Sequence, residues 1–308
     1  SDVNSLTLGE DTVISTGELS SQQWEILFET NDNTQGSILS EAMKSLRFQK
    51  QTQTSSVYKK IGKSPAEVDA DMTTVIERGF DLSLLPSQIN QESVEISNRA
   101  PNVGKYVYNT FGANVNAWLV QKVQHKLSNS SFTTFFGDDP SKSNLISKLN
   151  EFSHSETSSL YIDCSKIGTT DGIGGMIVDL ISNHLINLDK IDIKPFVMFI
   201  DEVHRYTKSV TNELDYHTGL TSIAREGRKK GVFLFLTTQN PNDVPDILLG
   251  QIGTLLIHRL THSEELRAIQ NHLKNHTLGQ IKKLNQGESI LTSINLLQDI
   301  HITIDECD

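Results

Sequence analysis

Two adjacent carboxylates, Asp201 and Glu202, directly follow the short apolar run of residues 196–200. A continuously apolar run of this length is typical of a strand buried on both faces of a parallel sheet. Ligands of such sheets bind at the carboxyl ends of the strands, where both carboxylates are therefore expected. The pattern is that of a Walker B motif, whose aspartate holds a nucleotide's magnesium, usually through water, and whose glutamate polarises the attacking water. Many doubly wound sheets have acidic strand ends, so the pair alone leaves a structural role open.

Two more polar segments follow in a fixed order along the chain. A basic segment, residues 224–231, contains Arg225 and Arg228, and Gln239 follows the next apolar run. Phosphoryl transfer needs a metal-holding carboxylate, a group that positions water and positive charge that meets the developing anion. Taken singly, Gln239 fits a loop-capping amide, and the basic segment fits a solvated helix end that the helix dipole favours. The acidic pair, the basic segment and Gln239 occur together in this order, which favours a role in phosphoryl transfer over three separate structural roles.

The elements that must position these residues alternate after about residue 130. Apolar runs predict strands at 160–163, 196–200, 232–236, 254–258 and 287–292. Helical spacing predicts helices over 172–187, 218–230 and 263–273, the second ending at Gly231. Strands that alternate with helices indicate an α/β fold, a parallel sheet flanked by helices on both faces.

The first 130 residues do not show this alternation of strands and helices. A short strand is expected at 11–15, and helices are expected over 20–28, where Ser20 or Ser21 is the N-cap, and over 35–50. Residues 51–105 are polar and predict an elaborate loop with short helices such as 66–77. A further helix over 113–128 is expected to bury one face, made of Val115, Trp118, Leu119, Val123 and Leu127. We therefore expect residues 1–18 at the edge of the core, 19–130 as a mostly helical insertion and 131–308 as the C-terminal half of the core.

Composition limits the class of protein. The 308 residues carry a net charge of −11, which argues against a protein that coats nucleic acid over its whole surface, although a local basic loop can still contact phosphates. Cys164 and Cys307 lie far apart and suggest neither a disulfide framework nor zinc spacing, so a cytoplasmic setting is expected. No apolar stretch approaches the roughly 18 residues that a membrane helix needs. The polar N-terminus has no signal-peptide anatomy.

The run FVMFIDEVHRY and the later segment SIAREGRKKGVFLFLTTQNPNDVPDILLGQIGTLLIHRLTHSEEL resemble the C-terminal half of HerA-type ATPases. These are relatives of FtsK-like DNA translocases within the RecA-like P-loop class. The resemblance covers residues 115–308 well and 1–110 loosely. It implies a hexameric ring that threads double-stranded DNA and hydrolyses ATP with Mg²⁺ between subunits. It also implies a helicase-type role in prokaryotic repair, end processing or restriction and antiphage defence, with a nuclease or other effector as partner.

The same resemblance implies roles for particular residues. Asp201 would be the magnesium residue and Glu202 the catalytic base. Gln239 would sense the γ-phosphate. Either Arg225 or Arg228 would reach a neighbouring subunit as the arginine finger, and the sequence does not choose between them.

One departure from the family pattern is large. A phosphate-binding P-loop, or Walker A motif, needs Gly, four residues and then Gly-Lys-Ser/Thr, but Val57 stands five residues before the Gly62-Lys63-Ser64 segment. We therefore expect the P-loop to lie before Ser1, or the chain to belong to a relative that has lost it. A sheet without its P-loop strand would also expose apolar surface. Two alternatives remain: a catalytically silent RecA-like assembly module that recruits an effector, and an unrelated doubly wound enzyme built around Asp163 and Asp201.

Overall fold

The computed structural model describes residues 3–30, 34–128, 130–137, 139, 141–155, 159–167, 173–188, 194–207, 218–274 and 277–305. The predicted start of a helix at residue 172 and Cys307 lie outside them. The chain divides into two compact units, Ser1–Gly168 and Thr169–Asp308. The three-part division expected from the sequence, with boundaries at 18 and 130, stays a prediction.

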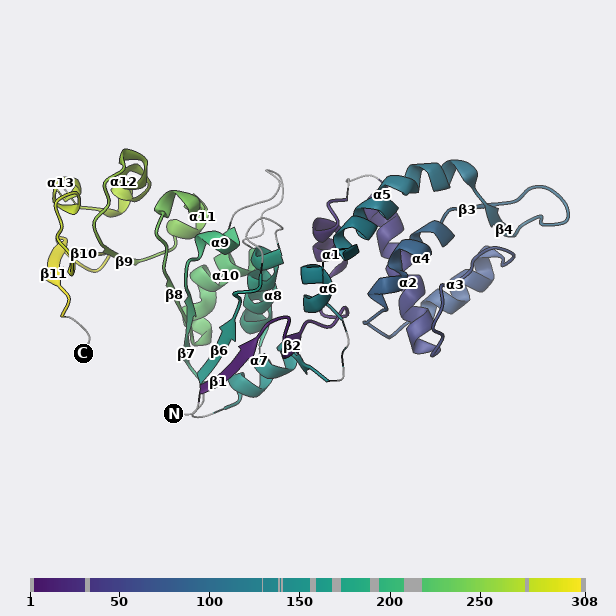
Figure 1. Cartoon of the computed structure of the whole chain (residues 1–308), viewed down its shortest axis with the longest axis horizontal. Helices are drawn as coiled ribbons and strands as arrows, with labels where there is room; N and C mark the ends of the chain where they lie inside the picture. Colours follow the sequence, from purple (N-terminus) through teal and green to yellow (C-terminus); the bar gives the residue numbers. More distant parts are fainter. Residues whose placement is uncertain are drawn as a thin grey trace. The chain divides into compact units, whose positions relative to one another are not determined.

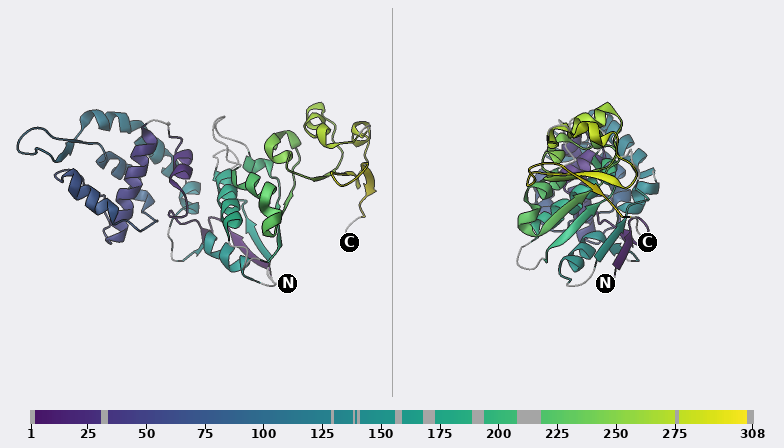
Figure 2. Two further views of the ribbon diagram at one scale, coloured as in Figure 1. Left: turned by 180° about the vertical axis from the view of Figure 1, so that it is seen from behind. Right: turned by 90° about the vertical axis from the view of Figure 1, so that its left-hand side faces the viewer.

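The C-terminal unit is built on two neighbouring parallel strands, β7 (Phe196–Ile200) and β8 (Val232–Leu236), paired from Phe196↔Val232 to Ile200↔Leu236. Helices α8 (Ile173–Asn187) and α10 (Thr218–Glu226) lie side by side along one face of this pair, as Figures 1 and 2 show from opposite sides. The inward side chains of both strands pack in one core with the helices; this core contains Val178, Met198, Ile200, Val203, Leu220, Leu234, Leu236, Val244, Leu248 and Leu249. The predicted α/β fold is confirmed here.

The opposite face of β7 and β8 is open. Val197, Phe199, Phe233 and Phe235 are exposed by 46 to 63% of their surface, and the rings of Phe199 and Phe235 stack with centroids 5.3 Å apart. The prediction that residues 196–200 are buried on both faces is therefore wrong for the described chain. The reason is that α8 and α10 both pack on the inner face, so alternate side chains on the outer face have no cover.

A tight basic turn connects α10 to β8. The 3-10 turn η2 (Gly227–Lys230) ends at Gly231, whose φ of 83° is left-handed, and Phe196 N donates to Gly231 O at 2.9 Å. Gly227 has no room for a side chain, because a Cβ there would lie 2.8 Å from Val232 O. The predicted helix over 218–230 with its stop at Gly231 is confirmed, except that its last turn is a 3-10 turn.

The C-terminal strands do not continue the parallel pairing. β9 (Thr254–Ile257), β10 (Glu288–Ser293) and β11 (Ile300–Thr303) form an antiparallel sheet in the order β11-β10-β9. The intervening elements are η3 (Pro241–Asp243), α11 (Asp246–Leu249), α12 (Ser263–Ile269), η4 (Gln270–His272) and α13 (Leu278–Ile281). β9 and β10 were expected from their apolar runs, but β11 was not. Its exposed, half-polar sequence IHIT has no buried face to mark it.

The N-terminal unit is mainly helical. Its helices are α1 (Ser21–Leu27), α2 (Gln35–Gln51), α3 (Pro65–Thr73), η1 (Leu82–Leu84), α4 (Leu85–Gln91), α5 (Thr110–Ser128), α6 (Ser130–Phe135) and α7 (Leu145–Ser153). The expected N-cap of α1 is confirmed, because Ser20 forms a capping box with Gln23. Among the described residues of both units, no helix is long and apolar enough to cross a bilayer.

Three strand pairs complete this unit. β1 (Val3–Thr7) runs parallel to β6 (Ser159–Asp163), β2 (Thr12–Val13) runs parallel to β5 (Ser143–Asn144), and β3 (Val94–Ile96) is antiparallel to β4 (Tyr106–Tyr108). The strand expected at 11–15 is reduced to the two residues of β2, and β1 and the β3–β4 pair were missed. All three are short and mostly polar, so long-range pairing decides them rather than local pattern.

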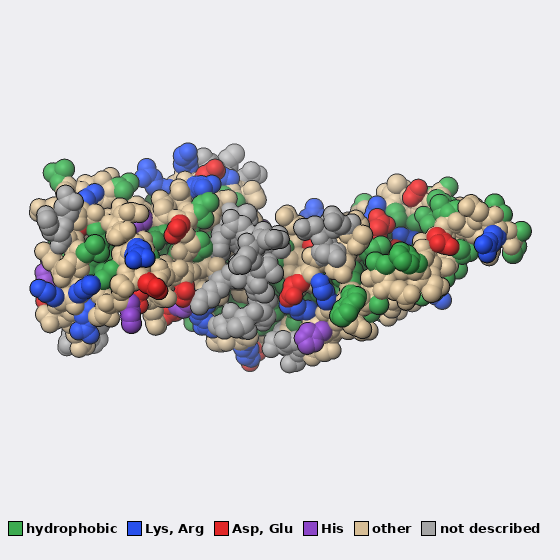
Figure 3. Space-filling view, turned by 90° about the horizontal axis from the view of Figure 1, so that it is seen from above, with side chains coloured by type: hydrophobic (Ala, Val, Ile, Leu, Met, Phe, Trp, Pro, Cys, Tyr) green, Lys and Arg blue, Asp and Glu red, His purple; other side chains and the backbone are tan. Residues whose placement is uncertain are grey.

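Helix α5 buries a different face from the one expected. Leu119 and Val123 are buried as predicted, but Val115 and Trp118 are exposed by 41% and 69%. The buried stripe includes Asn116 instead, because Asn116 lies between Leu119 and Val120 at 100° per residue. Figure 3 shows hydrophobic side chains at the surface over the helices of this unit.

A buried polar network joins α2, α4 and the segment before α3. Lys60 and Glu92 form an ion pair in which their side chains are only 8% and 1% exposed. Glu92 Oε1 also accepts hydrogen bonds from Ser45 Oγ at 2.7 Å and Gln88 Nε2 at 2.8 Å. Burial alone would lower the pKa of Lys60, but attraction to Glu92 and Glu41 overcomes it and raises that pKa. The charges are thus paired and hydrogen-bonded as a buried pair must be.

We expect Glu92→Ala to lower the free energy of unfolding of the N-terminal unit by about 3–5 kcal/mol, because it leaves the Lys60 charge buried without its partner. The double variant Lys60→Met/Glu92→Leu should recover most of the loss. Urea unfolding followed by tryptophan fluorescence measures this selectively, since both tryptophans, Trp24 and Trp118, lie in this unit. Equal stability of wild type and Glu92→Ala would contradict it.

Candidate active site

The carboxyl ends of β7 and β8 meet at one edge of the C-terminal unit. Ile200 pairs with Leu236, so Asp201 and Thr237 leave the two strands at the same level. Thr237 N donates to Ile200 O at 3.0 Å, and Val203 N donates to Thr237 O at 2.9 Å. The expectation that these two strands are neighbours, and that the side chains following them share an edge, is confirmed.

The Thr237 hydroxyl ties the two strand ends together. It donates to Asp201 Oδ1 and accepts from Glu202 N at 3.0 Å. The side-chain amide of Gln239 donates to Glu202 Oε1. Three of the predicted site residues, Asp201, Glu202 and Gln239, thus form one hydrogen-bonded cluster.

Glu202 is held in an uncommon conformation. Its φ of 51° is left-handed, which costs a residue other than glycine roughly 1–3 kcal/mol unless surrounding contacts enforce it. Its side chain is 25% exposed, and His204 Nδ1 lies 3.2 Å from its Oε2. That contact has ion-pair distance but not hydrogen-bond geometry, so Oε2 is a buried oxygen that no described group bonds. A carboxylate with one oxygen bonded and one left over can accept a proton.

Sequence reasoning missed the hydroxyls in this cluster. The sequence pattern does not single out Thr237 or Thr238, although the Thr237 hydroxyl accepts from Glu202 N and the Thr238 hydroxyl contacts His204 Nδ1. Their position in the sequence could have identified them. A hydroxyl residue directly after one parallel strand lies opposite the residue that follows the adjacent strand.

The two arginines lie elsewhere in the unit. Arg225 is in the last turn of α10 and Arg228 in η2, both exposed, at the amino end of β8. Gln239 follows the carboxyl end of that strand, on the order of 13 Å away along five residues. The structure does not bring either arginine to the acidic cluster of its own chain.

The near-match to a phosphate loop is a helix start. Ser64 caps α3 through a capping box with Glu67. Lys63 Nζ bonds Asp71 Oδ2 at 2.7 Å and the Tyr58 hydroxyl at 3.0 Å. The lysine is already paired, and the segment follows no strand, so it has neither the context nor a free cation for phosphate.

At this edge of the described structure, Asp201 is the residue predicted to hold a metal ion. Among the described residues, no group of three or more His, Cys, Asp or Glu side chains is arranged to hold an ion. Asp201 is exposed and would share the ion with water and phosphate rather than enclose it. Asp163, considered for an unrelated enzyme, belongs to the N-terminal unit, where the Ser165 backbone N–H and hydroxyl hold its pKa below the usual range.

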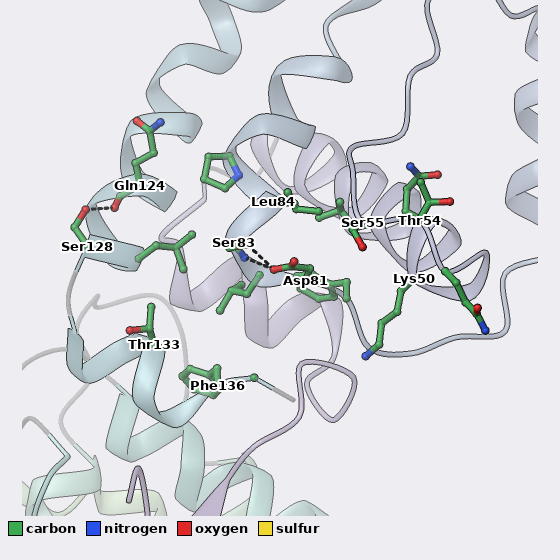
Figure 4. Close-up of a pocket in the computed structure, with 18 residues that line it drawn as sticks. Lys50, Thr54, Ser55, Asp81, Ser83, Leu84, Gln124, Ser128, Thr133 and Phe136 are labelled. Atoms are coloured by element: carbon green, nitrogen blue, oxygen red, sulfur yellow. Dashed lines mark hydrogen bonds between the residues drawn. The ribbon is translucent and has the colours of Figure 1, made fainter. Parts of the chain in front are cut away.

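A groove of about 1120 Å³ in the N-terminal unit is a separate feature. Figure 4 shows its polar side chains, including Lys50, Asp81 and Gln124, with Asp81 bonded to Ser83. None of the residues predicted for phosphoryl transfer lines it, so it is not the candidate active site.

Comparisons with known proteins find a family match over the part of the chain that contains the acidic cluster. Residues 177–295 match the family described as helicase HerA-like C-terminal. The chain is 28% identical over 122 residues to the probable DNA double-strand break repair helicase HerA of Methanocaldococcus jannaschii, covering 39% of this chain and 24% of that protein. It is 24% identical over 214 residues to the DNA double-strand break repair helicase HerA of Sulfurisphaera tokodaii, covering 61% and 42%. The chain thus spans less than half the length of these curated relatives.

A solved structure extends the likeness to the fold of the whole chain. VirB4 of Thermoanaerobacter pseudethanolicus matches with a TM-score of 0.63 and 13% identity, over 99% of this chain and 77% of that one. The fold is that of the RecA-like P-loop ATPases. Within the chain, the segment that matches the HerA-like C-terminal family contains all five predicted site residues.

We expect Thr237→Val to lower the free energy of unfolding of the C-terminal unit by about 1–3 kcal/mol, because it leaves Asp201 and Glu202 N without their shared partner. Thr237→Ser keeps the hydroxyl and is the matched control. Urea unfolding followed by circular dichroism measures the difference. A valine variant as stable as the serine variant would show that this hydroxyl does not tie the strands.

Proposed function

We propose that Asp201, Glu202 and Gln239 form the metal-holding and water-activating part of an ATP-hydrolysing site. The observation that carries this proposal is their hydrogen-bonded cluster with Thr237 at the carboxyl edge of β7 and β8. A parallel sheet binds its ligands at this edge, and phosphoryl transfer needs these group types there.

The proposed roles follow from the exposure and the hydrogen bonds of each side chain. Asp201 is exposed and would hold Mg²⁺ through water, and the ion would supply positive charge to offset that of the phosphates. Glu202 acts as the base that takes a proton from the attacking water, and Gln239 orients its carboxylate through Oε1. The second N–H of the Gln239 amide remains to meet the γ-phosphate.

We propose that a polypeptide segment beyond these 308 residues supplies the phosphate-binding loop. The sequence contains no Gly-x4-Gly-Lys-Ser/Thr motif. The open apolar face of β7 and β8, made of Val197, Phe199, Phe233 and Phe235, supports cover by further chain, because parallel sheets are normally covered on both faces.

At the level of the whole protein, we propose a HerA-like hexameric ring in the cytoplasm that couples hydrolysis to movement of double-stranded DNA. The relatives named as DNA double-strand break repair helicases support a DNA substrate. A setting in repair or in restriction and antiphage defence, with a nuclease or other effector, rests on the family resemblance. In a ring, only the pore surface needs to be basic, so the net charge of −11 is compatible with DNA.

A catalytically silent assembly module is the second proposal. The missing phosphate-loop motif favours it, because without such a loop the chain has no cradle for a nucleotide. Nucleotide binding by the intact protein separates the two proposals: a motor binds and hydrolyses ATP, whereas a silent module does neither.

Glu202→Gln in the intact protein should lower the rate of ATP hydrolysis by at least about 100-fold and leave ATP binding unchanged, because only the proton acceptor is lost. Hydrolysis is measured with and without double-stranded DNA, and binding by equilibrium titration. Glu264→Gln, the same charge change on the exposed start of α12, should have no effect on either. Normal turnover by Glu202→Gln would refute the Walker B assignment.

Arg225→Ala or Arg228→Ala should reduce hydrolysis, and mixing with Glu202→Gln subunits should restore part of it. The reason is that both arginines lie away from the acidic cluster of their own chain, so a finger must act on a neighbour. Activity is measured over a series of mixing ratios. If no ratio restores turnover for either arginine, neither acts between subunits.

A further inference from the structure

His204 lies between the two catalytic strand ends. It begins the short helix α9 (His204–Thr207), two residues after Glu202. Its Nδ1 is 3.2 Å from Glu202 Oε2 and also 3.2 Å from Thr238 Oγ1. Because its side chain is only 21% exposed, the ring is held in this place by its surroundings.

The hydrogen bonds of Thr238 favour one tautomer of this histidine. Thr238 Oγ1 donates to Asn240 O at 3.0 Å and accepts from Asn240 N at 3.2 Å. With its single proton on Asn240 O, its contact with the ring nitrogen uses the remaining lone pair, and this arrangement requires a hydrogen on His204 Nδ1. The ring is thereby anchored to the segment that follows β8.

The ring nitrogen also lies against the Glu202 carboxylate. The bond to Thr238 directs the hydrogen, and Glu202 Oε2 lies 3.2 Å from the ring nitrogen, where it is buried and accepts no described hydrogen bond. Gln239 holds the other oxygen, so the carboxylate is fixed from two sides. A strained residue such as Glu202, with φ 51°, needs this kind of outside restraint to keep one side-chain position.

We propose that His204 is a positioning residue for ATP hydrolysis: its ring, anchored on Thr238, lies against Glu202 Oε2 and keeps the carboxylate in the position from which it acts on the attacking water. The proposal rests on the proposed function of Glu202. His204 does not touch the nucleotide, so it should affect the rate of the chemical step rather than nucleotide affinity.

The kinetic test compares His204→Leu with His204→Asn in the intact protein. Leucine fills similar space without a donor, whereas the amide nitrogen of asparagine takes nearly the place of Nδ1. We expect leucine to lower kcat about tenfold or more, with KM for ATP changed by less than about threefold, and asparagine to restore most of kcat. A leucine variant with normal kcat, or an asparagine variant as slow as leucine, would overturn the proposal. Unchanged thermal unfolding of both variants shows that folding is not the cause.

A second measurement does not depend on activity. In the intact protein with ¹⁵N-labelled histidine, the His204 signals are assigned by their loss in His204→Asn. We expect Nδ1 to carry a hydrogen, this preference to be lost in Thr238→Val, and the Nδ1 resonance to shift in Glu202→Gln. A ring protonated only at Nε2 overturns the positioning role. If the contact is confirmed but the wild type hydrolyses no ATP, it is the proposed function that fails.

Discussion

The parallel pairing of β7 with β8 is the constraint on which the candidate site depends. Each strand contributes only part of the chemistry, the carboxylates after β7 and the amide after β8. Their register places both sets at one edge, and the Thr237 hydroxyl then fixes Asp201 and the backbone of Glu202 relative to each other. A slip of one residue would turn every side chain to the other face and separate the cluster.

One face of this strand pair is packed and the other is exposed. Its inner face packs on α8 and α10, whereas its outer face presents stacked, exposed aromatic rings. A contiguous apolar surface of this kind is costly in water and is typical of surfaces that contact other polypeptide. Packing and sequence thus support the same proposal, because this face is exposed in the described structure and the sequence contains no phosphate-loop motif.

Different interactions hold the N-terminal unit together. Its helices pack around an aromatic cluster that contains Trp24, Phe28 and Phe132, and they also enclose the Lys60–Glu92 pair. Such a pair is weak evidence for stability, but it penalises arrangements that leave either charge unpaired. Its features carry no part of the proposed phosphoryl chemistry, which lies wholly in the matched segment 177–295.

Local pattern determined the acidic pair, the order of the three polar segments, the long helices and the two apolar strands, since each depends on residues close in sequence. The family resemblance added the roles of Asp201, Glu202 and Gln239. Only the tertiary structure decided what depends on distant neighbours: the short polar strands, the exposed side of α5 and the one-sided cover of β7 and β8. It also decided the contacts of Thr237 and His204, because a hydroxyl or an imidazole has no preferred partner until folding brings one within about 3 Å.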